Sequence, residues 1–296
     1  KENFYMVENT VDGKFFVTAR GWEDLSEILK SYEELQVEIG EELIGEFLQK
    51  EEIARDFAGY YRLYEKYKSD YQIQEILDGN VTTGQLKTCC DMGKKASFEE
   101  RFTVTEMLLE AVTERISVFQ KTDEKIEKLY ENLKLLKIFL QEKNSVEAME
   151  QFVASRRKAL DAKICSELLT AEEAAREEEQ IRILEEYFFQ LKELHISDVA
   201  EGIEQIGERF GNVCRLRNEK LEETKKMLEQ AFSFLEECFG EGQELLLFET
   251  GLTGDDRCSI FISQYGCPSY FKHCELLLYS KKENEMRKEC RDLLEE

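Results

Sequence analysis

Apolar residues recur at spacings of three and four along most of this chain, which is the pattern of amphipathic helices. The first stripe follows Thr18, a candidate N-cap residue, and comprises Trp22, Leu25, Leu29 and Tyr32. A second stripe runs from Glu41 to Leu77. Ahead of both, the turn signal at Asp12-Gly13 and the mostly apolar residues 14–17 indicate one brief extended segment.

The second stripe contains a row of tyrosines at positions 60, 61, 64, 67 and 71. Nucleic-acid bases could stack on such a row, but a bound strand also needs basic residues along its phosphates. The chain carries 40 Lys and Arg against 64 Asp and Glu, a formal net charge of −24. We therefore interpret the tyrosines as core residues with hydroxyl ends in water, and we expect no nucleic-acid partner and no binding to anionic membrane.

Residues 80–98 lose the helical periodicity and are predicted to be a linker. Ser97 with Glu100 three residues later then has the pattern of a capping box, so a long helix should begin there. A helix over residues 98–142, with heptad-like apolar spacing, would be about 65 Å long. Such a length exceeds a compact domain and predicts a stalk.

Further helix starts are indicated at Asn144 with Glu147 and at Thr170 with Glu173, and a helix or a pair of helices spans 198–239. Short turns separate these segments, so neighbouring helices should be antiparallel. Glutamate-rich stretches such as 172–179 are interpreted as the solvated faces of this acidic stalk.

The predicted fold class is all-α, with only one proline in 296 residues to interrupt helices. We expect a small helical lid-like domain at 1–79, a linker at 80–98, an antiparallel, coiled-coil-like stalk of helical hairpins at 99–240 and a small helical C-terminal module at 241–296. Within the module, Leu245–Leu252 fits a helix or an extended segment, and 280–296 should be helical. No apolar run is long enough to span a bilayer, and no signal peptide is visible, so we expect a cytoplasmic protein.

The nine cysteines include no C-x-x-C pair, and we interpret them as free thiols in a reducing cytosol. Cys267, His273 and Cys274 lie close in sequence, but their spacing matches no common zinc site. We expect this group to be packing and predict no metal site.

No catalytic motif is present, and we predict no catalytic residue. A P-loop needs a glycine-rich turn that wraps phosphates, and the nearest imitation, 88–95, has Thr88 in place of the first glycine. No apolar run leads into the Asp-Glu of a Walker B strand. His195 at a helix end and His273 among aromatic residues are interpreted as structural, and carboxylate spacing nominates no pair among so many acids.

The run Gly13-Lys14-Phe15-Phe16-Val17-Thr18-Ala19-Arg20-Gly21-Trp22, continuing through 23–26, 53–58 and 60–64, resembles the helical lid of a MoxR-type AAA+ ATPase, in the branch found in anaerobic Gram-positive bacteria. The resemblance covers residues 1–80, and more loosely the stalk and 261–267. It implies that Arg20 is the nucleotide-sensing arginine that points at phosphates from a lid helix. A guanidinium beside a helix start is poorly placed for the helix dipole and well placed to reach an anion on another domain.

The resemblance further implies a C-terminal region of a chaperone-like remodeler, with helices that dock partners or substrate. Such ATPases assemble as hexamers and often act with a partner that carries a von Willebrand factor A domain. ATP and magnesium are then expected for the parent protein and no cofactor for this chain, which lacks an initiator Met and a P-loop.

The main alternative is a stand-alone acidic coiled-coil adaptor whose first 80 residues only resemble a lid. A metal-dependent enzyme built on helical carboxylates ranks last. It would need a Glu-x-x-His pair, whereas Lys192 and Tyr270 precede His195 and His273 by three residues.

Overall fold

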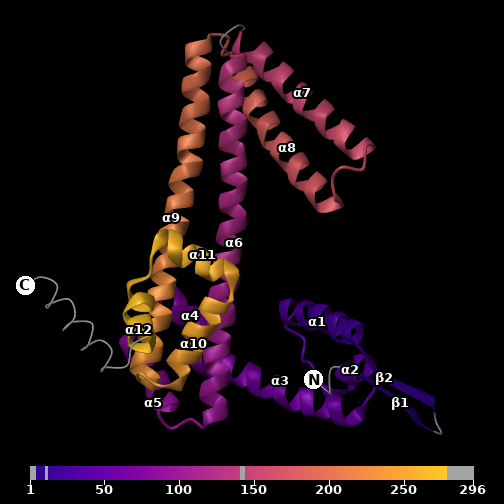
Figure 1. Cartoon of the computed structure of the whole chain (residues 1–296), viewed down its shortest axis with the longest axis vertical. Helices are drawn as coiled ribbons and strands as arrows, with labels where there is room; N and C mark the ends of the chain where they lie inside the picture. Colours follow the sequence, from indigo (N-terminus) through magenta and orange to yellow (C-terminus); the bar gives the residue numbers. More distant parts are fainter. Residues whose placement is uncertain (1–4, 11–12, 141–143, 279–296) are drawn as a thin grey trace, which may run out of the picture.

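The computed structural model describes residues 5–10, 13–140 and 144–278. These residues are 83% helical and contain a single two-stranded sheet, so the all-α class is confirmed. Figure 1 shows a small N-terminal unit beside the base of a long helical pair, with a splayed hairpin at the far end of that pair.

The N-terminal unit begins with a β-hairpin and continues into helices. Strands β1 (Met6–Thr10) and β2 (Gly13–Val17) pair antiparallel, with Met6 opposite Val17. The extended segment expected at 14–17 is therefore confirmed, with a partner strand that periodicity did not indicate. Helix α1 (Ala19–Glu34) follows, and the Thr18 hydroxyl accepts from Gly21 N at 3.0 Å, as its N-cap position predicts.

The second apolar stripe is divided among α2 (Glu41–Phe47), α3 (Glu51–Tyr71) and α4 (Ile73–Asp78). The first break follows from the hairpin, because Gln49 N donates to the Phe16 carbonyl and its side-chain oxygen accepts from Phe16 N, each at 3.3 Å. The second break lies at Gln72, whose φ of 50° is left-handed. Val17, Leu25, Leu48 and other buried residues of β2 and α1–α3 form the core of this unit.

The predicted linker at 80–98 is wrong over most of its length. Helix α5 (Thr83–Gly93) occupies it, and Thr82 with Gln85 forms a complete capping box. The helix packs against α9 (Val199–Phe239), where an added Cβ on Gly93 would lie 2.8 Å from the Phe239 ring. Its contact face therefore consists of small residues, which periodicity does not reveal.

Helix α6 (Phe98–Phe139) and α9 run antiparallel side by side and form the stalk (Figure 1). The Ser97 hydroxyl caps α6 by accepting a hydrogen bond from Glu100 N at 3.2 Å. The Glu100 side chain, which would complete the box, accepts from the Tyr71 hydroxyl at 2.9 Å. The expected capping box is thus half formed. Residues 141–142 of the predicted helix lie outside the described residues.

The hairpin α7 (Ser145–Cys165) and α8 (Ala171–Glu193) leaves the far end of the stalk, and its two helices pack against each other as predicted (Figure 1). The glutamate-rich face of α8 is solvated in part, since the side chains of Glu172 and Glu178 are 83% and 53% exposed. Glu177, Glu178 and Glu179 pair with Lys163, Arg157 and Lys125 at 2.6, 3.3 and 2.9 Å. These pairs connect α8 to α7 and to α6.

The C-terminal helices do not form a separate module. Helices α10 (Gln243–Gly254), α11 (Asp256–Tyr265) and α12 (Pro268–Leu278) contact the base of α6 or α9 and share one core with α4, α5 and the end of α3. Leu245–Leu252 is helical. The helix expected at 280–296 lies outside the described residues.

The stalk helices α6 and α9 contribute residues to two apolar cores, and a polar layer lies between these cores. The base core includes α6 residues up to Phe119, and the outer core includes α6 residues from Leu129 onward together with α7 and α8. Between them, Arg217 of α9 donates to both carboxylate oxygens of Asp123 at 2.7 and 3.0 Å. Tyr265 of α11 donates to the same carboxylate at 3.0 Å.

This ion pair is largely shielded, since 21% of the Arg217 side chain and 31% of Asp123 are exposed. Hydrogen bonds from Arg217 outweigh the effect of burial and hold the pKa of Asp123 below its usual value. Asp123 interrupts the apolar seam of α6, and a polar residue at such a position fixes helix register. The pair therefore sets how α6 and α9 align.

Replacing Asp123 with Ala should lower the free energy of unfolding by ~2 kcal/mol, because it leaves a partly buried guanidinium without its carboxylate. Asp123 has a lowered pKa, so its contribution is present at neutral pH and is lost as pH falls through the folded-state pKa. The difference between wild type and Asp123→Ala should then shrink on acidification, which urea unfolding at several pH values measures.

Glu219→Ala is the matched control. Glu219 pairs with Arg215 at 2.8 Å on the same helix, but both side chains are more than half exposed. Its loss should change stability by at most about 0.5 kcal/mol. Equal effects of the two substitutions would contradict the role assigned to Asp123.

Candidate functional site

Arg20, the residue predicted to sense nucleotide, lies in the first turn of α1. Its side chain is 86% exposed, and its ion pair with Asp24 spans 3.7 Å. Exposed pairs at this helix spacing contribute only about 0.3–0.5 kcal/mol, and a cation at a helix N-terminus is disfavoured by the helix dipole. The guanidinium is thus held weakly and can turn toward an anion outside the chain.

Gly21, next to Arg20, has a packing role. A Cβ atom at this position would lie 2.8 Å from the Phe47 carbonyl oxygen, so the start of α1 and the end of α2 can approach only where a side chain is absent. The ring of Trp22 meets Phe57 edge-on, with centroids 5.2 Å apart. These contacts fix the position of the α1 N-terminus, and with it the base of the Arg20 side chain.

The tyrosine row of α3 connects the N-terminal unit to the base. Tyr61 donates to Glu33 at 2.9 Å, and Tyr71 donates to Glu100 of α6 at the same distance. Burial first, and these hydrogen bonds second, raise the pKa of both hydroxyls far above the usual range. The rings of Tyr61 and Tyr71 are buried as predicted, whereas Tyr60 is 53% exposed, against the prediction of a core residue. The hydroxyls of Tyr61 and Tyr71 end on carboxylates of α1 and α6.

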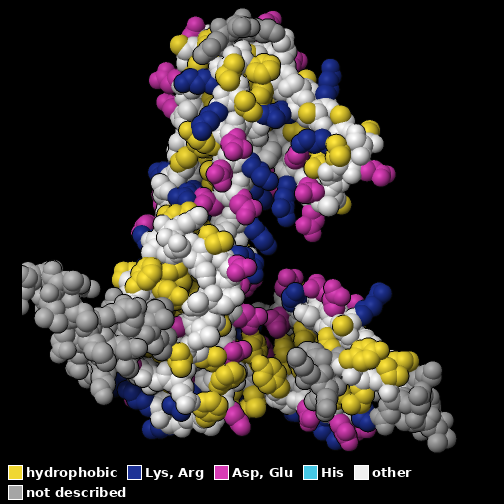
Figure 2. Space-filling view, in the orientation of Figure 1, with side chains coloured by type: hydrophobic (Ala, Val, Ile, Leu, Met, Phe, Trp, Pro, Cys, Tyr) yellow, Lys and Arg dark blue, Asp and Glu magenta, His cyan; other side chains and the backbone are white. Residues whose placement is uncertain are grey.

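Acidic side chains gather where α1 faces α6 across this junction, as Figure 2 shows. The pKa of Tyr64 is raised mainly by burial and then by the charges of Glu110 on α6 and Glu33 on α1. Lys68 contacts Glu33 at 3.4 Å. The junction is therefore a negatively charged face with one basic contact to Glu33.

The segment that imitates a P-loop, 88–95, offers no phosphate cradle. Most of it belongs to α5, where backbone N–H groups bond within the helix. Lys94 N and Lys95 N donate to the carbonyls of Cys90 and Met92 at 3.0 and 2.9 Å. The amide groups that would wrap a phosphate are already occupied.

The two histidines have different surroundings. His195 follows α8 with a φ of 55°, and its Nδ1 lies 2.9 Å from the Lys192 carbonyl, as a helix-end position predicts. His273 is buried in α12, where its ring stacks on Phe232 and its Nε2 bonds to Glu236.

Cys267 and His273, which lie close in sequence, contact different glutamates of α9. The Cys267 Sγ lies 3.2 Å from Glu229 of α9, whereas His273 bonds to Glu236 of that helix. The Cys274 side chain lies outside the described residues. Among the residues that are described, no group of three or more His, Cys, Asp or Glu is placed to hold a metal ion.

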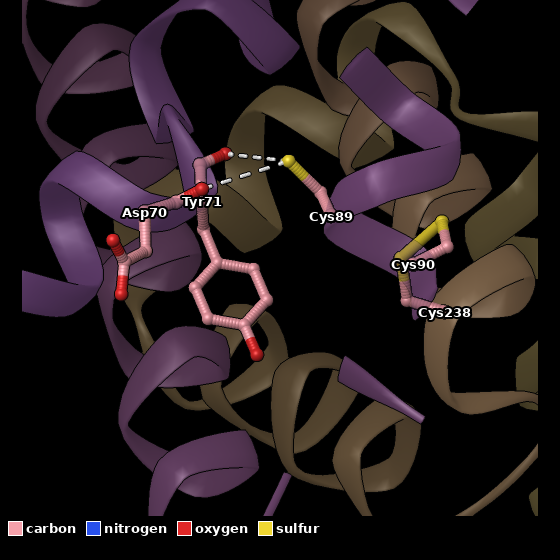
Figure 3. The surroundings of a disulfide bond; sticks show 5 residues. All are labelled: Asp70, Tyr71, Cys89, Cys90 and Cys238. Atoms are coloured by element: carbon pink, nitrogen blue, oxygen red, sulfur yellow. Dashed lines mark hydrogen bonds between the residues drawn. A yellow bond between two sulfur atoms is a disulfide. The ribbon is translucent and has the colours of Figure 1, made fainter. Parts of the chain in front are cut away.

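The expectation of free thiols is wrong for one pair. Cys90 of α5 and Cys238 of α9 are joined by a disulfide across 148 residues of sequence (Figure 3). Neighbouring Cys89 stays reduced and buried, with its Sγ 3.7 Å from the carbonyls of Asp70 and Tyr71. Burial raises the pKa of the Cys89 thiol, so it is a poor nucleophile beside the disulfide.

Comparisons with known proteins give no assignment. No family model matches the chain, and no curated protein or solved structure matches it significantly. Within the described part, no helix has both the length and the apolar character needed to cross a bilayer.

Reduction of the Cys90–Cys238 disulfide should destabilise the base. Closing a loop of 148 residues removes unfolded-state entropy on the order of 4–5 kcal/mol in the chain-entropy account. Addition of a phosphine reductant, or Cys238→Ser, should lower the thermal midpoint, whereas Cys165→Ser at an exposed thiol should not. Peptide mapping without reductant should recover the crosslinked pair, and its absence would contradict the bond.

Proposed function

We propose that this chain is the C-terminal region of a MoxR-type AAA+ ATPase, a bacterial chaperone-like remodeler. It supplies the lid with its sensor arginine and the helices that dock a partner or substrate, and it does not hydrolyse ATP by itself. The observation that carries the proposal is Arg20, an 86% exposed guanidinium at the start of a helix whose position is fixed by packing.

The division of the chain supports a lid that moves as a unit. The N-terminal hairpin and helices have their own apolar core, separate from the base core. Helix α3 belongs to both, since Ile53 packs in the first core and Tyr71 in the second. A continuous helix transmits rotation, so movement of the lid on nucleotide would reach the base through α3.

The splayed hairpin supports a docking role. Helices α7 and α8 leave the end of the stalk opposite the base beside which the N-terminal unit lies (Figure 1). Exposed apolar side chains occur there, including Ile138 of α6 and Phe189 of α8, at 63% and 56% exposure. A protein that carries a von Willebrand factor A domain is the proposed partner, within a cytoplasmic hexamer of the parent protein that binds ATP and magnesium.

The alternative function is an acidic adaptor that acts without an ATPase core. The paired stalk and hairpin support it, because they have the shape of a spacer with an exposed end. The adaptor hypothesis assigns no functional role to Arg20. The gene separates the two, since the ATPase proposal expects a P-loop and a Walker B strand in roughly the 200–250 residues before Lys1.

Arg20→Ala should slow ATP turnover of the parent protein by about tenfold, the loss of one charge-assisted hydrogen bond to phosphate in the transition state. Steady-state hydrolysis measures this effect. Stability should stay within about 0.5 kcal/mol, because the side chain is exposed.

Lys30→Ala is the control on the same helix, since Lys30 is exposed and pairs with Glu27 at 2.9 Å. It should leave turnover unchanged. Normal turnover in Arg20→Ala would remove the sensor role, and binding of a fluorescent ATP analogue by the isolated chain would refute the absence of a nucleotide site.

A further inference from the structure

Helix α5 depends on one covalent bond for its attachment to the base. Its buried residues are Cys89, Cys90 and Gly93, none larger than cysteine, and two further side chains are buried in part. Such small residues remove little apolar surface from water, so their packing contributes little to docking. The neighbouring α4 is shorter, yet it buries two isoleucines and one leucine. The bond from Cys90 to Cys238 therefore gives α5 the attachment that α4 obtains from packing.

The two adjacent cysteines of α5 point to different helices (Figure 3). Cys90 is bonded to Cys238 of α9, whereas the Cys89 Sγ donates to the carbonyls of Asp70 and Tyr71 at 3.7 Å. These carbonyls belong to the last turn of α3, where main-chain acceptors have no partner within the helix. The Cys89 thiol thus caps α3 from a helix that the disulfide holds in place.

Gln85 gives α5 a further contact at the same place. Its Nε2 atom donates to Gln72 Oε1 at 3.4 Å. Gln72 separates α3 from α4 and has a left-handed φ of 50°, which persists in a residue other than glycine only where its surroundings hold it. We call residues 70–73 the α3–α4 junction. Because α3 connects the N-terminal unit to the base through this junction, α5 clamps the joint that carries the unit.

The base core takes its large side chains from other helices. Phe232 of α9 meets Phe248 of α10 edge-on, with centroids 5.2 Å apart, and Phe261 of α11 packs in the same core. A helix of 11 residues is marginal in water when nothing packs against it, because few hydrogen bonds offset the cost of its nucleation. Without its attachment, α5 would therefore unfold locally while the phenylalanine core stays packed.

We propose that the Cys90–Cys238 pair is a redox switch: its disulfide clamps α5 on the α3–α4 junction, and reduction by a dithiol releases α5 and loosens the N-terminal unit. The dithiol gives up two electrons and two protons. The sulfur–sulfur bond is thereby replaced by thiols on Cys90 and Cys238 and by a disulfide in the reductant. No nucleotide takes part, so the switch is independent of the ATPase assignment.

Burial restricts the exchange to this one pair. Cys90 and Cys238 are 5% and 2% exposed, so a reductant reaches them only when α5 opens. Burial also raises the pKa of Cys89, which keeps this thiol protonated and unreactive toward the neighbouring disulfide. The switch thus has two states, the disulfide and the dithiol, and Cys89 caps α3 in the first.

Hydrogen exchange of the full chain, before and after treatment with dithiothreitol, tests the switch. Loss of the crosslink lowers the global stability, so protection should fall in every helix of the base. Protection in α5 should fall at least about tenfold further than in α10 and α11, because α5 opens locally. Protection at the end of α3 should fall with it, and reoxidation should restore both.

Cys89→Ala separates the cap from the crosslink. It keeps the disulfide, so α5 should stay protected, whereas the end of α3 loses a weak donor and should exchange about two- to threefold faster. Cys258→Ala is the matched control, since this thiol of α11 is also buried, with its Sγ 3.6 Å from Thr113 Oγ1. It should leave exchange at the end of α3 unchanged.

Trypsin gives a second readout on the unmodified chain. Lys87 is an exposed residue within α5, and Lys158 is one within α7. A protease cuts a helix after local opening, so reduction should speed cleavage after Lys87 and leave Lys158 intact. Unchanged cleavage at Lys87 after full reduction, or an equal fall in protection across α5, α10 and α11, would overturn the switch. A count of nine free thiols before reduction, which is every cysteine of the chain, would overturn it as well.

Discussion

The ion pair between Asp123 and Arg217 is the constraint on which the arrangement of this chain depends. Two apolar seams of α6 and α9 could slide past each other by a turn with modest loss of packing, because their apolar residues repeat. A bidentate pair at one level allows a single alignment. Tyr265 ties α11 to the same level at 3.0 Å. The base core and the outer core therefore form in register with each other.

The polar layer also separates two kinds of packing. Below it, short helices surround the stalk and the core is rich in phenylalanine, with Phe119 meeting Phe261 edge-on at 5.6 Å. Above it, α7, α8 and the upper part of α9 share a core of leucine and aromatic residues with α6, and surface ion pairs such as Arg157 with Glu185 at 2.7 Å connect α7 to α8. The two halves of the stalk thus have different neighbours.

Much of the fold could be predicted from local signals, because caps and periodicity act over a few residues. Thr18, Ser97 and Thr170 each begin a helix where their side chains accept a backbone hydrogen bond. Helix α5 escaped prediction, since its contact face is made of small residues and glycine. The Cys90–Cys238 bond joins positions that only tertiary structure brings together.

The candidate sites also combine features that local sequence signals predict with features that only tertiary contacts create. The exposure of Arg20 follows from its position one residue into a capped helix, which the sequence indicates. The role of Gly21 does not, because it depends on the Phe47 carbonyl of another helix. The bond between His273 and Glu236 also joins two separate helices, α12 and α9, and no spacing in the sequence places them together.

The length of the stalk has a mechanical consequence. A helix of 41 residues, such as α9, extends about 60 Å. A tilt of roughly 5° about its lower end would carry the upper end through roughly 5 Å. Small rearrangements among the short helices below are therefore magnified into displacements as large as one helical turn at the hairpin.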